Sequence, residues 1–273
     1  MAKRPIGLFD SGVGGLSILN QVHHLLPNED LIYVADQAHV PYGPRSRLEV
    51  RQFSVAITRY LLDEGAKLIV VACNTASAAA LEHLRATFPD TPFVGMEPAV
   101  KPAAQRTESG KVGVLATPAT FEGELFASVV ARYADGVDVH QRVVPGLVER
   151  IEAGDLTGPE THRLVEDAVR PLLDEGIDTL VLGCTHYPFI LPILHQLVGP
   201  EVELIDPSPA VARQVRRVLE EQDAIAPAHS PGRHTFYTTG DPARMAEAVQ
   251  RFVGQPGELH ALTWDSGVLS RSA

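Results

Sequence analysis

Short runs of apolar residues alternate with longer amphipathic segments along most of this chain. Eight apolar runs have the length and the Val, Ile and Leu content of buried strands, and they cover residues 6–10, 31–36, 68–73, 92–97, 111–117, 138–144, 179–184 and 202–206. Segments of helical character lie between them, as at 46–64 and 160–175. This alternation predicts an α/β fold with mostly parallel sheets.

Part of this pattern occurs twice. Residues 61–75 (LLDEGAKLIVVACNT) align without a gap with residues 172–186 (LLDEGIDTLVLGCTH), at an offset of 111, and 7 of the 15 positions are identical. The chain has only two cysteines, Cys73 and Cys184, and they occupy the same position in the two copies.

Two further pairs of segments match in the same order along the chain. The segment 5–11 aligns with 111–117 and places Ser11 opposite Thr117. The tetrapeptide GMEP, which contains Glu97, resembles LIDP, which contains Asp206. Three matching blocks in one order indicate two pseudo-symmetric α/β domains.

The repeats also suggest where the domains begin and end. We expect a first α/β domain over residues 1–97 and a second over 98–207. A C-terminal segment, 208–265, contains two further helical patterns, and we expect it to pack back on the first domain. Residues from about 266 to 273 have little to bury, so we expect them to be mobile.

Composition excludes several classes of protein. A chain of 273 residues with 45% hydrophobic content can build a substantial core without metals or disulfides. The net charge of −11 and the lack of a basic cluster argue against nucleic acid as a partner. The start, MAKRPIGLFDSG, has no signal-like apolar stretch, and no apolar run approaches a membrane span of ~20 residues. With two distant cysteines, these features favour a cytoplasmic protein that does not bind a membrane.

Both cysteines come at the ends of predicted strands, where parallel α/β folds bind their ligands. Asn74 and Thr75 follow Cys73 and are good residues to begin a helix, whose positive end favours a thiolate. Thr185 and His186 follow Cys184. A single free cysteine is often only a small buried apolar residue. Two cysteines at matched strand ends favour a functional role.

Cofactor sites fit the sequence poorly. Two cysteines and one nearby histidine lack the clustered spacing of a zinc site, and no lysine ends a predicted strand to form a Schiff base. The glycine-rich turn DSGVGG matches neither a dinucleotide fingerprint nor a Walker loop. We therefore expect no cofactor and no metal.

Two thiols on two similar domains suit one class of reaction closely. Inversion of a carbon centre by proton transfer needs a base on one face and an acid on the other. We expect these thiols to face each other across an active site in the cleft between the domains. Candidate assisting groups are Asp10, at a predicted strand end, and the carboxylates Glu149 and Glu152 with His186.

At this point the sequence resembles the glutamate racemases, of the cofactor-independent aspartate/glutamate racemase superfamily. The matching segments are PIGLFDSGVGGLSIL (5–19), PYG (41–43), VACNTASA (71–78), LVE (147–149), LGCTHYP (182–188) and FYTTGD (236–241). The resemblance implies interconversion of L- and D-glutamate, which supplies D-glutamate for peptidoglycan, and it implies a homodimer.

The resemblance also assigns roles to residues. It implies that Cys73 and Cys184 exchange the α-proton on opposite faces of glutamate, that Asp10 assists Cys73, and that Glu149 and His186 assist Cys184, with Glu149 fitting the family pattern better than Glu152. The implied substrate contacts are Asp10, Ser11, Tyr42, Gly43, Asn74, Thr75, Thr185 and His186, and Thr117 joins them because it aligns with Ser11.

One stretch departs from the family pattern. Many relatives read Gly-Asp-Thr-Ala-Arg before PYG, whereas residues 35–40 here read ADQAHV, so contacts made by this loop are in question. Two alternatives remain open at the level of sequence. One is an aspartate racemase or another isomerase of the superfamily. The other is a two-lobed amino-acid binding protein without catalysis, which would have no reason to carry matched thiols.

Overall fold

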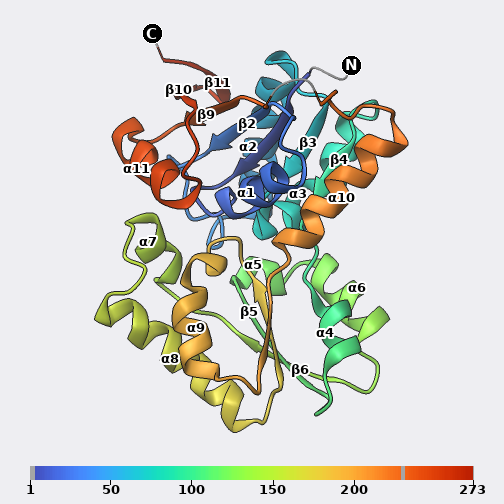
Figure 1. Ribbon diagram of the computed structural model, residues 1–273, viewed down its shortest axis with the longest axis vertical. Helices are drawn as coiled ribbons and strands as arrows, with labels where there is room; N and C mark the ends of the chain where they lie inside the picture. The colour runs from blue at the N-terminus through green and yellow to red at the C-terminus, as the bar shows by residue number, and fades with distance from the viewer. Residues whose placement is uncertain (1–3, 229–230, 273) are drawn as a thin grey trace. The chain divides into compact units, whose positions relative to one another are not determined.

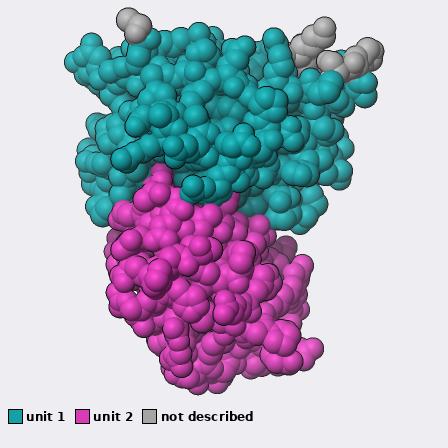
Figure 2. All heavy atoms as spheres, turned by 60° about the vertical axis from the view of Figure 1, so that its left-hand side comes forward, with its two compact units in different colours: residues 1–96, 208–273 teal, residues 97–207 magenta. Residues whose placement is uncertain are grey.

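The chain folds into two compact units. The structure, a computed structural model, describes residues 4–228 and 231–272. Unit 1 combines the chain up to Met96 with the chain from Ser208 onward, and unit 2 comprises Glu97–Pro207. Figure 2 colours the atoms of the two units separately. The chain therefore leaves unit 1 once, builds unit 2 without interruption, and returns.

Unit 1 is built on a sheet whose described strands follow the order β11-β10-β9-β2-β1-β3-β4. These strands are β1 (Ile6–Asp10), β2 (Leu31–Ala35), β3 (Leu68–Val71), β4 (Phe93–Gly95), β9 (His234–Thr238), β10 (Glu258–Asp265) and β11 (Val268–Arg271). All neighbouring pairs are parallel except β10 with β11. Every residue of β1, β2 and β3 is buried, which explains their continuous apolar character.

Helices cover both faces of this sheet (Figure 1). On one face α1 (Leu16–Leu25) packs against α10 (Ser208–Glu221) and α11 (Pro242–Phe252), and on the other α2 (Arg47–Asp63) packs against α3 (Asn74–Thr87), as right-handed crossovers require. A capping box begins α2: the Ser46 hydroxyl accepts from the Glu49 amide, and the Glu49 carboxylate accepts from the Ser46 amide.

Unit 2, all of whose residues are described, has a parallel sheet with the order β6-β5-β7-β8. Its strands are β5 (Lys111–Ala116), β6 (Asp138–Arg142), β7 (Thr179–Gly183) and β8 (Glu203–Ile205). Its helices are α4 (Val100–Arg106), α5 (Pro118–Phe121), α6 (Glu124–Tyr133), α7 (Leu147–Glu152), α8 (Pro159–Asp174) and α9 (Leu191–Val198), with a 3₁₀ helix, η1, at Tyr187–Ile190. The edge strand β6 has no fully buried residue, which agrees with its polar sequence.

The two sheets share a winding order. The run β2-β1-β3-β4 in unit 1 has the same order as β6-β5-β7-β8 in unit 2. The segments that align in sequence therefore occupy equivalent strands, β1 with β5, β3 with β7 and β4 with β8. Each of the eight predicted runs contains a strand. The predicted fold class, two pseudo-symmetric α/β units with mostly parallel sheets, is confirmed.

The C-terminal segment belongs to the sheet of unit 1, where β9 lies between β2 and β10. A buried ion pair fastens the chain just after α10. The Lys67 ammonium lies 2.6 Å from the Glu29 carboxylate and donates to the Ala224 carbonyl, and the other Glu29 oxygen accepts from the Ala226 amide.

The expectation that residues after about 266 are mobile is wrong for most of that stretch. Residues Val268–Arg271 form β11, which pairs antiparallel with β10. The Leu269 side chain is buried in the core of unit 1, and the ladder with β10 pairs the backbone of this strand. Residue 273 lies outside the described residues.

Candidate active site

Cys73 stands between a buried strand and a helix. It follows β3 with an extended backbone (φ −144°, ψ 123°) and forms the N-cap of α3. Its side chain is 5% exposed, and neither cysteine of the chain is in a disulfide. The positive end of a 14-residue helix stabilises negative charge on this sulfur. The position therefore favours a nucleophilic or basic thiolate.

Asp10 ends the neighbouring strand β1 and is fully buried. One of its carboxylate oxygens, Oδ2, accepts from the amide of Gly15 at 3.0 Å and more weakly from that of Gly12 at 3.4 Å. A Cβ atom on Gly15 would come within 2.9 Å of Asp10 Cβ and 2.8 Å of the Tyr33 hydroxyl, so glycine is needed here. The glycine-rich turn thus holds a buried carboxylate in place at the same strand edge as Cys73.

Tyr42 connects these two groups. Burial raises the pKa of the Tyr42 phenol well above its ordinary value, and the negative charges of Asp36, Cys73 and Asp10 raise it further. The Tyr42 ring and the Cys73 side chain belong to one buried cluster. The hydroxyl of Tyr42 donates to Asp36 at 2.7 Å. Because that proton is already engaged, a substrate could be bound here by the backbone of this loop, including Gly43.

Asn74, Thr75 and Ser11 complete the polar residues of this edge, and each is 4% exposed. Within the described part of the chain, neither the side-chain oxygen nor the side-chain nitrogen of Asn74 has a hydrogen-bond partner. Burying an amide without partners is costly. The Asn74 amide is therefore suited to bind a polar ligand.

Cys184 occupies the equivalent place in unit 2. It follows β7, its side chain is 6% exposed, and its carbonyl accepts from the Tyr187 amide at the start of η1. The Cys184 sulfur lies 3.7 Å from Nδ1 of His186, which is itself buried. Thr185, between them, is 2% exposed. The residues around this thiol thus bring the His186 imidazole within hydrogen-bonding reach of the Cys184 sulfur.

The carboxylate that contacts His186 is Glu152, whereas the sequence favoured Glu149 as the group that assists Cys184, and that assignment stays a prediction. His186 Nε2 donates to Glu152 Oε1 at 2.6 Å, whereas Glu149 is exposed at the start of the same helix, α7. Glu149 acts at longer range: after burial and Cys184, its charge contributes to raising the pKa of Tyr187. Both carboxylates fit the sequence, and only the turn of α7 distinguishes the one that reaches the histidine.

The environment of His186 favours its charged form. Burial lowers the pKa of His186, but the hydrogen bonds and the negative charges of Cys184 and Glu152 outweigh burial, so its pKa lies well above the ordinary value. A protonated imidazole next to a sulfur stabilises thiolate there, and it can also carry a proton to and from the sulfur.

Thr117 stands at the end of β5, as Ser11 stands after β1. It forms the N-cap of α5, and its hydroxyl shares a hydrogen bond of 3.0 Å with the Thr120 hydroxyl. The predicted residues Asp10, Ser11, Cys73, Asn74 and Thr75 lie at or just after strand ends in unit 1, as Thr117, Cys184, Thr185 and His186 do in unit 2. Tyr42 and Gly43 lie in the loop after β2, and Glu149 is exposed on α7.

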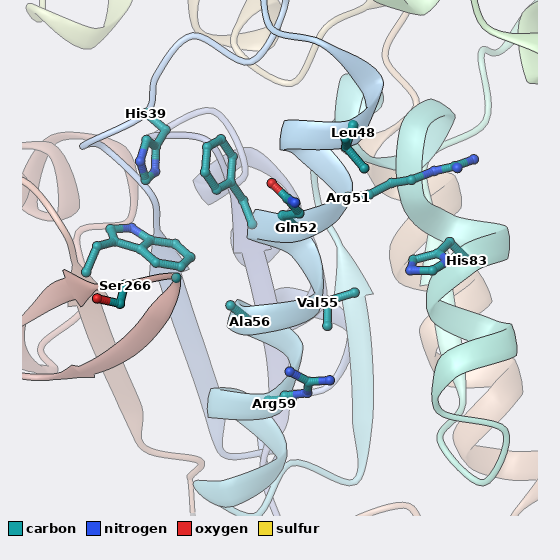
Figure 3. Close-up of a pocket in the computed structure, with 12 residues that line it drawn as sticks. His39, Leu48, Arg51, Gln52, Val55, Ala56, Arg59, His83 and Ser266 are labelled. Carbon is teal, nitrogen blue, oxygen red and sulfur yellow. The ribbon is translucent and has the colours of Figure 1, made fainter.

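A separate groove of about 690 Å³ runs along the outer side of α2 (Figure 3). Arg51, Arg59 and His83 line it together with the rings of His39, Phe53 and Trp264, and its lining contains no aspartate or glutamate. None of the predicted site residues lies in this groove.

Among the described residues, no three His, Cys, Asp or Glu side chains are grouped so that they could hold a metal ion. No described helix combines the length and the apolar character of a membrane span.

The sequence is similar to known racemases. The sequence matches the Asp/Glu/Hydantoin racemase family over residues 14–215. It is 53% identical to the glutamate racemase of Roseiflexus sp. (strain RS-1) over 251 residues, which cover 92% of each chain. It is 51% identical to the glutamate racemase of Ectopseudomonas mendocina (strain ymp) over 260 residues, 95% of this chain and 98% of that one.

Solved structures agree with this relationship. A crystal structure of a glutamate racemase isoform from Bacillus anthracis superposes with a TM-score of 0.87 at 30% identity and covers 98% of this chain and 100% of its own. The glutamate racemase of Francisella tularensis, solved in complex with D-glutamate, gives a TM-score of 0.86 at 31% identity, covering 97% and 100%.

Fold and site together define a class: α/β proteins of two similarly wound units, each with a buried cysteine at the end of a central strand. The chain belongs to the Asp/Glu/Hydantoin racemase family. The resemblance seen in the sequence is confirmed at this level.

Proposed function

We propose that this protein interconverts L-glutamate and D-glutamate by proton transfer between two thiols. The observation that carries the proposal is the pair of buried cysteines at equivalent strand ends, Cys73 after β3 and Cys184 after β7. Relatives at 53% and 51% identity over most of the chain are glutamate racemases, which supports glutamate as the substrate.

In the proposed reaction, one thiolate removes the α-proton of glutamate, and the C–H electron pair stays on the carbon. The other thiol then gives its proton to the opposite face, and its S–H electron pair stays on sulfur. The two sulfurs have exchanged protonation states at the end, so the reverse reaction starts from the product state. Asp10 is proposed to assist Cys73. His186 is proposed to assist Cys184 together with Glu152, the carboxylate it contacts, or with Glu149, which the sequence favoured.

Holding the substrate is the second task. We assign the substrate carboxylates to backbone amides and polar side chains at the two strand edges, which include Ser11, Gly43, Asn74, Thr75, Thr117 and Thr185. Amides at the first turn of α3 are oriented donors, so they stabilise negative charge that develops in the transition state without a lysine or arginine clamp. The side-chain amide of Asn74, which has no hydrogen-bond partner among the described residues, supports this assignment on the side of unit 1.

The decisive experiment is circular dichroism of purified protein incubated with L-glutamate and no added cofactor. The signal should decay to zero as the racemic mixture forms, and L-aspartate under the same conditions should decay far more slowly. An unchanged glutamate signal would sink the proposal. Faster decay with aspartate would reassign the substrate within the family.

The same assay tests the chemistry. Activity should survive EDTA and hydroxylamine, which remove metals and block carbonyl cofactors, and it should fall after alkylation of thiols with iodoacetamide. Protection from alkylation by D-glutamate would place the reactive thiols at the substrate. Loss of activity with EDTA or hydroxylamine would contradict the two-thiol mechanism.

We further propose that the protein acts in the cytoplasm as a homodimer and supplies D-glutamate for peptidoglycan. Expression in a bacterial strain that requires D-glutamate should restore growth without it, and a Cys73→Ala, Cys184→Ala double variant should not. Sedimentation equilibrium of the wild-type protein should give twice the mass of the chain. Growth rescue by the double variant, or a monomer at all concentrations, would contradict these two assignments respectively.

A further inference from the structure

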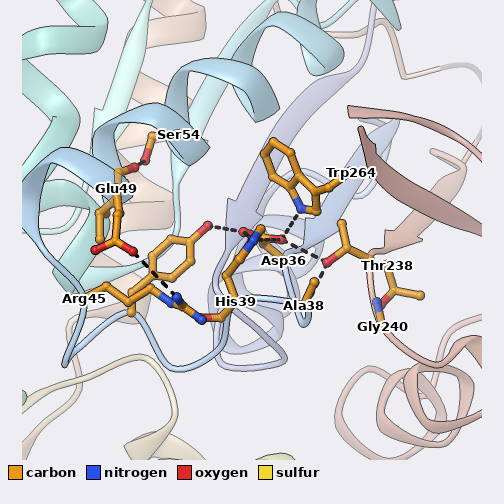
Figure 4. A network of polar contacts seen from close by, with 12 residues as sticks. Asp36, Ala38, His39, Arg45, Glu49, Ser54, Thr238, Gly240 and Trp264 are labelled. Atoms are coloured by element: carbon orange, nitrogen blue, oxygen red, sulfur yellow. Dashed lines mark hydrogen bonds and ion pairs between the residues drawn. The ribbon is translucent and has the colours of Figure 1, made fainter. Parts of the chain in front are cut away.

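Asp36 is a buried carboxylate that the proposed reaction does not use. It directly follows β2 and is fully buried. In sequence it lies far from both cysteines. Four side chains donate to its two oxygens, as Figure 4 shows in part. The donors are His39 at 2.9 Å, Tyr42 at 2.7 Å, Thr239 at 2.9 Å and Trp264 at 2.7 Å.

These donors come from three separate parts of the chain. His39 and Tyr42 lie in the loop after β2, Thr239 follows β9, and Trp264 lies in β10. Thr239 also accepts from the Ala38 amide at 2.9 Å, which adds a second tie between the loop and the C-terminal strands. An ionised carboxylate only accepts hydrogen bonds, so one group can hold all four donors at once.

The two oxygens of Asp36 divide this work. Oδ1 accepts from Thr239 and Trp264, on the side of the C-terminal strands. Oδ2 accepts from Tyr42, whose ring is 1% exposed and shares a buried cluster with Cys73. The ring of His39 bridges both oxygens, at 3.1 and 2.9 Å. Asp36 thus joins the outer strands of the sheet to a tyrosine that shares a buried cluster with the Cys73 thiol.

The outer side of the network is supported by aromatic packing. The His39 ring stacks on Phe53 with 3.9 Å between centroids, and Trp264 meets His39 edge-on at 5.2 Å. These three rings form one wall of the groove along α2, as Figure 3 shows for the labelled His39.

We propose that Asp36 is a positioning residue for the reaction at Cys73: by accepting a hydrogen bond from the Tyr42 hydroxyl, it fixes the Tyr42–Gly43 segment where that segment would meet the substrate. The inference rests on the proposed function, because it concerns how glutamate is held for that reaction. Asp36 acts only through Tyr42 and does not touch the substrate itself.

Asp36→Asn tests the proposal because it keeps the shape and removes one acceptor. If the amide oxygen stays with Trp264 and Thr239, the amide NH₂ group faces Tyr42 and His39, which both donate to this side of Asp36 in the wild type. The Tyr42 hydroxyl then loses its acceptor and must turn its proton elsewhere, which loosens the Tyr42–Gly43 segment. We expect KM for glutamate to rise about tenfold with kcat changed less than about twofold, because a shifted binding segment weakens ground state and transition state alike.

Glu29→Gln is the matched control, since Glu29 is a second fully buried carboxylate of unit 1 and pairs with Lys67. It should lower the melting temperature and leave KM unchanged. Tyr42→Phe supplies the other half of a double-mutant cycle. If Asp36 acts through Tyr42, Asp36→Asn should raise KM by less than about twofold in the Tyr42→Phe background.

The outcomes separate cleanly. A wild-type KM in Asp36→Asn, a full tenfold effect in the Tyr42→Phe background, or an equal rise in KM from Glu29→Gln would each overturn the inference. If Asp36→Asn does not fold, Trp264→Phe removes one donor and keeps an aromatic ring; it should raise KM about threefold at unchanged kcat, and an unchanged KM would overturn the inference. Absence of racemisation by the wild-type protein would instead refute the proposed function.

Discussion

His186 donates from Nε2 to Glu152 at 2.6 Å, while its other ring nitrogen lies 3.7 Å from the sulfur of Cys184. The histidine thus stands between a thiol and a carboxylate in unit 2. Its raised pKa keeps the imidazole protonated, so it can stabilise the thiolate and exchange a proton with it.

Glu152→Gln tests this relationship, with Glu149→Gln as control on the same helix. Without the Glu152 charge, the pKa of His186 falls, so the imidazole loses its proton at a lower pH. We expect kcat with L-glutamate to drop about 10- to 100-fold and the alkaline limb of the pH–rate profile to move to lower pH. Glu149→Gln should change kcat less than about threefold. The reverse ranking of the two variants would restore Glu149 as the assisting carboxylate.

Asp10→Asn tests the carboxylate beside Cys73. The asparagine still fits the turn and can accept from the Gly15 amide with its remaining oxygen. It cannot take a proton, so kcat should fall about 100-fold in the direction that uses Cys73 as base. The check is the initial rate with D-glutamate, with melting temperature measured in parallel. A rate near that of the wild type would leave Asp10 with a purely structural role at the turn.

Single substitution of each thiol tests the two-face mechanism. Cys73→Ala and Cys184→Ala should each abolish racemisation in both directions, because each direction needs one thiolate and one thiol. With 3-chloroglutamate, removal of the α-proton and departure of chloride need only one base. We expect Cys184→Ala to eliminate chloride from the D-substrate alone and Cys73→Ala from the L-substrate alone.

Chloride release followed for each enantiomer makes this assay selective. The inactive double variant is the blank, and equal melting temperatures exclude misfolding as the cause of a lost reaction. Should both single variants retain the same enantiomer, the assignment of one thiol to each face would be wrong.

A histidine pair predicts sensitivity to acid in unit 1. His234 Nε2 lies 3.2 Å from His23 Nδ1, and burial, with the charge of His23, lowers the pKa of His234 to about 4. The unfolded chain binds this proton near pH 6.5, so stability should fall as pH drops from about 6.5 to 4. His234→Gln should reduce that loss by about 1–2 kcal/mol in urea unfolding measured at pH 7 and pH 4.5. The exposed His83→Gln should not, and an equal effect of both variants would contradict this account.

The sequence by itself determined the class of fold and the two thiols. Strands buried on both faces must be apolar throughout, so runs such as 68–73 and 179–184 could be recognised without a structure. Duplication then placed Cys73 and Cys184 at equivalent strand ends, because a repeated run of strand and helix repeats its end as well. Both features depend on periodicity and local order, which a linear sequence contains.

Only the tertiary structure decided which partners these residues have. Glu149 and Glu152 both fit the sequence as groups near Cys184, and the turn of α7 brings Glu152 into contact with His186. Residues 268–271 carry a weak local signal, and pairing with β10 orders them as a strand. Asp36 meets Thr239 and Trp264 across more than 200 residues of chain. Such contacts depend on how segments far apart in the sequence are brought together in space. Local propensity and periodicity carry no information about that arrangement.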